Sequence, residues 1–169
     1  MKKIILLFLM FSAVVFAKWE VGTSYLSDGT SLIIFKTYDT TSFLFESSDN
    51  SLWKELCPYM YIGVNVEYSI SVVTIEHYQI EKGDNLSLIV TDNEGNEVNC
   101  KFYSDDIEDY YIKNTVGRSG VLTKMLYNGK SAKLIKDFET IATFDLRGIK
   151  QIMQKHVGSS YWFKYKLND

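Results

Sequence analysis

The apolar residues of this 169-residue chain recur at every second position in several short segments, which are separated by clusters of Gly, Asn, Asp and Ser. Side chains two positions apart lie on the same face of an extended strand, so this period is typical of strands that bury one face. The longest regular segment runs from Val64 to Val72. The pattern predicts a mainly β, antiparallel fold.

The alternation changes phase where Val72 is followed directly by Val73. From that point the series continues at odd-numbered positions, with Val73, Ile75 and His77, and no longer at even-numbered ones. A shift by one residue moves every following side chain to the opposite face of a strand. The phase change therefore predicts a bulge or a bend at Val72 and Val73 in one continuous strand.

Other segments with the same character complete the predicted β core. Leu86–Val90 and Val98–Phe102 flank a Gly-containing turn and predict a hairpin. Leu32–Phe35 is apolar on both faces, which predicts a strand covered on both sides. The remaining predicted strands are Glu20–Tyr25, Leu32–Lys36, Ser42–Glu46 and Met60–Gly63.

The last third of the chain adds helices. We predict a short helix over Val121–Tyr127 and a hairpin from Lys133–Phe138 and Thr140–Phe144. Asp145 is the expected N-cap of an amphipathic helix that ends at Gly158. Its apolar stripe is Leu146, Ile149, Ile152 and Met153. This stripe is expected to cover the sheet, and a partner-binding face is the alternative. The whole is a β-sandwich-like domain with a short C-terminal helix.

Residues 1–17 have the three parts of a secretory signal peptide. Lys2 and Lys3 are positive, an apolar run follows from Ile4, and Val15 and Ala17 are small residues before the expected cleavage point. We therefore expect residues 18–169 to form a single exported domain, periplasmic or secreted, with no membrane-spanning segment after cleavage. An uncleaved anchor or a buried helix is the alternative.

Export to an oxidising compartment favours a disulfide between the two cysteines. Cys57 and Cys100 are the only two, and a pair in an oxidising compartment predicts a disulfide. Cys100 lies between Val98 and Phe102 on the apolar side of its predicted strand. Two independently buried thiols are the alternative.

Charge and motifs exclude several classes of function. The formal net charge of -3 has the wrong sign for a nucleic-acid-binding protein. The two histidines, His77 and His156, lie far apart, and Gly117-Arg118-Ser119-Gly120 lacks the spacing of a nucleophile elbow and predicts an exposed turn. No pattern for a cofactor or a metal is recognised. We therefore predict a protein that is not an enzyme.

The densest acidic stretch covers residues 105–109. A solvated loop is the expected structure. The alternatives are a cation site, because clustered carboxylates bind hard cations, and an unusual enzyme active site built from Asp105, Asp106 or Glu108.

Aromatic residues are the best candidates for binding. They could form a stacking surface for a sugar or an anchor for a protein, and packing in the core or on an edge strand is the alternative. The candidate contact aromatics are Tyr110, Tyr111, Tyr161, Trp162, Phe163 and Tyr165.

The step from the last strand into the last helix resembles a known family. It contains Phe144, Asp145, Leu146, Gly148 and Ile149, and it resembles the closing signature of the VasI family of exported type VI secretion accessory proteins. From the residues themselves we expect Phe144 to point inward, Asp145 to cap the helix, and Gly148 to let the helix approach the sheet closely. The resemblance implies an accessory role in secretion and supplies no catalytic residue.

Together these observations favour an exported, non-enzymatic domain of the cell envelope that binds an envelope or extracellular protein. The alternative is a secreted module that binds a glycan or a small ligand through surface aromatics.

Overall fold

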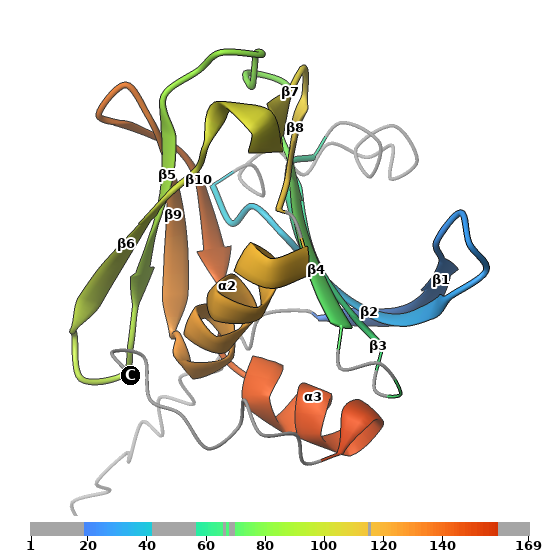
Figure 1. Cartoon of the computed structure of the whole chain (residues 1–169). Helices are drawn as coiled ribbons and strands as arrows, with labels where there is room; N and C mark the ends of the chain where they lie inside the picture. Colours follow the sequence, from blue (N-terminus) through green and yellow to red (C-terminus); the bar gives the residue numbers. More distant parts are fainter. Residues whose placement is uncertain (1–18, 42–56, 66, 68–69, 115, 159–169) are drawn as a thin grey trace, which may run out of the picture.

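A computed structural model describes residues 19–41, 57–65, 67, 70–114 and 116–158. Among these residues, ten strands form two antiparallel sheets that are covered by two helices (Figure 1). The predicted mainly β, antiparallel fold is confirmed. The elements are β1 (Glu20–Tyr25), β2 (Ser31–Tyr38), β3 (Tyr59–Asn65), β4 (Ile70–Glu76), β5 (Leu86–Thr91), β6 (Glu97–Lys101), the 3-10 turn η2 (Ser104–Asp106), β7 (Ile107–Glu108), β8 (Tyr111–Lys113), α2 (Val116–Asn128), β9 (Ser131–Lys136), β10 (Glu139–Asp145) and α3 (Ile149–Val157).

The core lies between the two sheets. The larger sheet has the strand order β1-β2-β3-β4-β8-β7, and the smaller one has the order β10-β9-β5-β6. Helix α2 packs against β4, and α3 contacts both α2 and β2. Fully buried side chains from both sheets and from α2 form one cluster, which includes Phe35, Ile62, Ile75, Leu88, Leu134, Phe144, Leu122 and Leu126.

A buried carboxylate connects the two sheets where β2 meets β10. Asp39 is 1% exposed and forms an isolated bridge with Phe144. Its Oδ1 accepts hydrogen bonds from the backbone N–H groups of Thr143 at 2.7 Å and Thr41 at 3.1 Å. Hydrogen bonds to an ionised acceptor are stronger than neutral ones, so Asp39 fixes this corner of the sandwich.

The predicted continuous strand from Val64 to Val72 is wrong. The chain reverses between β3 and β4, and Asn65 pairs with Ile70 in an uninterrupted antiparallel register. The predicted bulge at Val72 and Val73 is also wrong. Both residues are buried because both faces of β4 are covered, so two adjacent apolar residues need no change of phase.

Strand β2 is covered mainly on one face, contrary to the expectation from its apolar run. Phe35 and Thr37 point into the core and are buried. On the other face Leu32 is buried, whereas Ile34 stays half-buried. An apolar side chain costs little at the surface, so an apolar run alone does not establish burial on both sides.

The predicted hairpins are confirmed. β5 pairs with β6 with Leu88 opposite Cys100, and β9 pairs with β10. The second hairpin ends earlier than predicted, because β9 stops at Lys136 and Phe138 lies in the turn.

Helix α2 begins five residues before the predicted start, so Gly117-Arg118-Ser119-Gly120 forms part of its first turns. The prediction of an exposed turn for that segment is wrong. Ser119 is fully buried, and its hydroxyl donates to the carbonyl of Asn114 at 3.1 Å. Packing against β4 outweighs the roughly 1 kcal/mol by which each glycine disfavours a helix.

Helix α3 exists as predicted and ends at Gly158, but its start differs. Asp145 is the last residue of β10 and not the N-cap; its carboxylate accepts the backbone N–H of Arg147 at 3.0 Å and so closes the turn before the helix. Gly148 is the N-cap, with φ of 87°. A Cβ built on Gly148 would touch nothing within 4 Å, so the glycine provides a left-handed conformation and not a close approach to the sheet.

Some predictions fall outside the described residues, namely the signal peptide at 1–17 and the strand Ser42–Glu46. Within the described ranges, no helix is both long and apolar enough to cross a membrane.

Candidate functional site at the aromatic end

Two of the candidate contact aromatics lie on the surface. Tyr110 is 65% exposed and Tyr111 is 38% exposed. Tyr110 lies in the turn between β7 and β8 with φ of 74°. Its N–H donates to the carbonyl of Ile80 at 2.8 Å, and its carbonyl accepts from His77 at 2.9 Å. These two bonds hold the turn against the segment that follows β4. The other four candidates, Tyr161, Trp162, Phe163 and Tyr165, lie outside the described residues.

Within the described residues, sequence reasoning missed four further exposed aromatics, Tyr25, Tyr78, Tyr103 and Phe138. Tyr78 follows His77, the first residue after β4, and it is 65% exposed. Phe138 lies in the turn between β9 and β10 and is 96% exposed. The β9–β10 turn, the segment after β4 and the β7–β8 turn lie at the same end of the two sheets (Figure 1). We call Tyr78, Tyr110, Tyr111 and Phe138 the aromatic end.

Phe138 has an unusual backbone. Lys136 pairs with Glu139, so Asp137 and Phe138 alone form the loop, and their φ values are 48° and 74°. Positive φ at both positions is the geometry of a type I′ turn, whose second position favours glycine. A bulky aromatic residue is costly there, by roughly 1–2 kcal/mol. The turn therefore holds an exposed apolar side chain at a position that stability alone would give to glycine.

A cavity of about 420 Å³ opens beside this turn. The segment after β4 forms one side of the cavity with Tyr78, Gln79 and Glu81. The β9–β10 hairpin forms the other side with Lys136, Asp137, Glu139 and Ile141. The cavity thus lies between the β9–β10 hairpin and the segment that connects β4 of the larger sheet to β5 of the smaller one, and two of its lining residues flank Phe138 in the chain.

Lys136 is neutralised within this end of the molecule. Its Nζ lies 2.9 Å from a carboxylate oxygen of Asp84 and donates to the carbonyl of Gln79 at 2.8 Å. Hydrogen bonding to Asp84 raises the pKa of Lys136, so the ion pair persists at neutral pH. Glu81, Asp137 and Glu139 are exposed and give the cavity a negative rim.

Buried His77 packs against Tyr78 of the aromatic end. It is 3% exposed, and its ring stacks on that of Tyr78 with centroids 4.6 Å apart. Its Nδ1 accepts the N–H of Gln79 at 3.0 Å, and its Nε2 lies 3.0 Å from the carbonyl oxygen of Ile141. This pattern requires the neutral tautomer with hydrogen on Nε2. Burial lowers the pKa of His77, although the carbonyl of Ile141 opposes that shift.

We expect acid to destabilise the protein through His77. Because the pKa of His77 is lower when folded, the unfolded chain takes up the proton first, and stability falls as the pH drops below the unfolded value of about 6.5. The measurement is urea unfolding at about pH 7.5 and about pH 5.5. His77→Gln should lose less stability between these values than the wild type does. Equal losses in His77→Gln and in the wild type would contradict the assignment.

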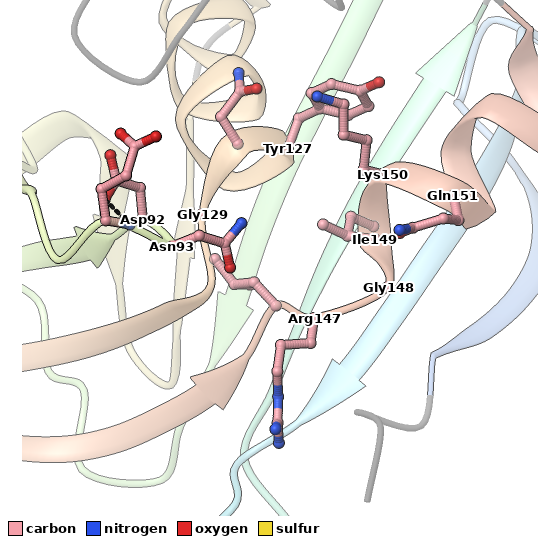
Figure 2. A pocket seen from close by; sticks show the side chains of 12 residues that line it. Asp92, Asn93, Tyr127, Gly129, Arg147, Gly148, Ile149, Lys150 and Gln151 are labelled. Carbon is pink, nitrogen blue, oxygen red and sulfur yellow. Dashed lines mark hydrogen bonds between the residues drawn. The ribbon is translucent and has the colours of Figure 1, made fainter. Parts of the chain in front are cut away.

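A second cavity, of about 390 Å³, is drawn in Figure 2, and the elements that border it lie at the opposite end of the molecule (Figure 1). It is bordered by the β5–β6 turn, the end of α2 and the start of α3, and its lining includes Asp92, Asn93, Tyr127, Arg147, Lys150 and Gln151. The ammonium of Lys150 lies 5.3 Å from the ring centroid of Tyr127. We call this region the α3 cleft.

The charged groups of the α3 cleft are largely engaged by neighbours. Arg147 forms a two-pronged ion pair with Asp145. The carboxylate of Asp92 accepts the N–H groups of Glu94 and Asn96, each at 2.9 Å, which fixes the β5–β6 turn. The arrangement therefore stabilises local turns.

The acidic stretch 105–109 is not a solvated loop throughout. Asp106 is 1% exposed, and its Oδ2 lies 2.9 Å from a guanidinium nitrogen of Arg118 on α2. Glu108 pairs with Lys82 at 3.1 Å, whereas Asp105 is exposed. Within the described part of the chain, no group of three or more His, Cys, Asp or Glu side chains could hold a metal ion. The carboxylates connect structural elements.

The two cysteines lie in different surroundings. Both are free, half-buried thiols. Cys57 lies just before β3, near Asp39, and Cys100 is on β6 of the other sheet, near Asp106. Burial raises the pKa of each thiol. A disulfide requires the two Cα atoms to approach within about 7 Å, and the pairing stays a prediction that mass spectrometry with and without reduction would test.

Comparisons with known proteins return no relative: no protein-family model matches the chain, and neither a curated protein nor a solved structure does.

Proposed function

We propose that this protein is an exported, non-enzymatic domain of the cell envelope that binds another protein through its aromatic end. The observation that carries the proposal is Phe138, an apolar side chain that is 96% exposed and held at φ of 74°. Strained backbone and exposed aromatic residues are both costs to a free protein, and both occur at binding sites. Rigid aromatic side chains are also the commonest anchors of protein interfaces.

Other features agree with a binding role. His77, the histidine at this end, has both ring nitrogens engaged by backbone groups of Gln79 and Ile141, which makes it a poor general base. The signal-peptide pattern of residues 1–17 supports export. The resemblance of the segment around Phe144 and Ile149 to the VasI family supports an accessory role in type VI secretion.

Site-specific photocrosslinking in the native host tests the proposal. The full-length tagged chain would carry p-benzoylphenylalanine in place of Phe138, where full exposure leaves room for the larger ring. A second strain would carry it in place of Val121, which is 61% exposed on α2. We expect a discrete envelope protein crosslinked to position 138 and not to position 121. Equal products from both positions, or none from position 138, would contradict the aromatic end as the binding site.

Phe138→Gly should separate stability from binding. Glycine relieves the left-handed strain but adds chain entropy to the unfolded state, so we expect the free energy of unfolding to stay equal or to rise by up to about 1 kcal/mol. Urea unfolding measures this change. Capture of the crosslinked partner, now with the photoprobe at position 78, should fall strongly. A clear loss of stability would mean that Phe138 has a packing role in place of a binding one.

The α3 cleft favours a second candidate, a module that binds a small ligand. Its volume of about 390 Å³ lies within the range of small-molecule sites. The indole N–H of Trp19 donates to the carbonyl of Arg147 at 3.2 Å, so Trp19 fluorescence should report on this cleft. A protein that keeps only this tryptophan, with Trp53→Phe and Trp162→Phe, would be titrated with a panel of glycans. An unchanged spectrum throughout would reject this candidate.

A further inference from the structure

The charges around the aromatic end indicate the chemistry of what binds there. Glu81, Asp137 and Glu139 are exposed on the rim of the 420 Å³ cavity. Among the described residues that line this cavity, Lys136 is the only basic one; it pairs with Asp84 at 2.9 Å and also attracts Glu81 and Asp137. One lysine therefore faces four carboxylates, Asp84, Glu81, Asp137 and Glu139, and the cavity keeps a net negative charge. Such a rim attracts cations and repels anionic surfaces.

The apolar part of the same surface is held in place by its backbone and by one ring stack. The loop of Asp137 and Phe138 contains only two residues, and the N–H of Asp137 is close to the carbonyl of Asn85 at 3.4 Å. The ring of Tyr78 stacks on that of buried His77. The backbone at Phe138 and the ring of Tyr78 are therefore largely ordered before binding, which reduces the entropy lost when a partner covers them. Exposed rings can also stack with a guanidinium group.

We infer that the aromatic end binds a polypeptide segment that carries both basic side chains, arginine or lysine, and apolar side chains on the face that it presents. The cations of that segment would pair with Glu81, Asp137 and Glu139, and its apolar residues would cover Phe138 and Tyr78. This inference rests on the proposed function and adds the chemistry of the partner to it. A second copy of the chain is disfavoured, because two such rims face to face would oppose carboxylates.

Defined peptides test this inference with the full chain. Three labelled peptides of about ten residues would combine pairs of leucines with pairs of arginines, glutamines or glutamates, so that each face of an extended peptide carries both kinds of side chain. Fluorescence anisotropy should show binding of the arginine peptide at least about tenfold tighter than that of the glutamine peptide, and none of the glutamate peptide. Raising sodium chloride from about 50 mM to about 500 mM should weaken the arginine complex by about tenfold, because salt screens exposed charges.

Matched variants assign the binding to this surface. Glu81→Gln with Glu139→Gln should weaken the arginine peptide by about tenfold, and Phe138→Gly should do the same. Glu97→Gln on β6 and Val121→Ala on α2 remove the same kinds of group elsewhere and should bind as the wild type does. Equal affinity in all variants would overturn the inference, since it would mean general attraction to an acidic protein.

The two proposals fail in different ways. If no peptide binds but position 138 still crosslinks one envelope protein, the basic chemistry is wrong and the protein-binding function stands. If neither experiment gives a product, both proposals are rejected. If chromatography shows a dimer that Phe138→Gly dissociates, a second copy occupies the surface and the inference is overturned.

Discussion

Ile149→Asp is expected to lower the free energy of unfolding by about 4 kcal/mol or more, which is a large part of the stability of an ordinary domain. Ile149 is the first residue of α3 and is 1% exposed. Aspartate there would be favoured by the helix dipole, but that gain is only about 0.3–1 kcal/mol. The loss of apolar contacts and the burial of an unpaired charge outweigh it. Urea or thermal unfolding measures the change.

Gln151→Asp is the matched control for that experiment. Gln151 lies two residues further in the same first turn and is exposed, so the new carboxylate gains the dipole interaction without burial. Its stability should equal or slightly exceed that of the wild type. An unfolding midpoint for Ile149→Asp close to that of Gln151→Asp would mean that α3 does not pack against the core.

Arg118→Leu should cost about 2–3 kcal/mol, because it leaves the buried carboxylate of Asp106 without its ion pair. The value lies at the lower end for a broken buried pair, since the Arg118 side chain is itself 39% exposed. The same guanidinium lies 4.2 Å from the ring centroid of Tyr103, so some packing is lost as well. Chemical denaturation of the purified protein would measure the loss.

A double-mutant cycle separates charge from packing at this site. Asp106→Asn removes the charge and retains an acceptor for the N–H of Tyr103, which lies 3.3 Å from the present Asp106 carboxylate. Combined with Arg118→Leu, it should restore at least half of the lost stability. Additive losses in the double variant would show that the ion pair itself contributes nothing, and that Arg118 acts only through its contact with Tyr103.

The candidate site was found only in part from the sequence. Tyr110 and Tyr111 stand out as adjacent aromatics after an acidic stretch, and both are exposed. The sequence predicts Phe138 at the end of the strand Lys133–Phe138, whereas the structure has it in the turn after β9. No local signal places it in a tight turn, because Asp137-Phe138 lacks the Asn-Gly or Asp-Gly pattern of two-residue hairpin loops. Tyr78 also lacks a local signal, since its exposure depends on how the segment after β4 crosses the molecule.

The sequence by itself determined the antiparallel β character, both predicted hairpins and the burial of Ile149 and Met153 on α3; Leu146, also expected on that helix, lies before its start, and Ile152 is only partly buried. These features depend on residues close together in the chain, whose spacing places them on one face of an element. Tertiary structure alone decided where elements begin and which faces are covered. Packing against β4 stabilises the helical conformation of Gly117–Gly120. Burial on both faces of β4 places Val72 and Val73 together in the interior. Asp106 pairs with Arg118 on α2. Each outcome depends on contacts between residues far apart in sequence, which local spacing cannot specify.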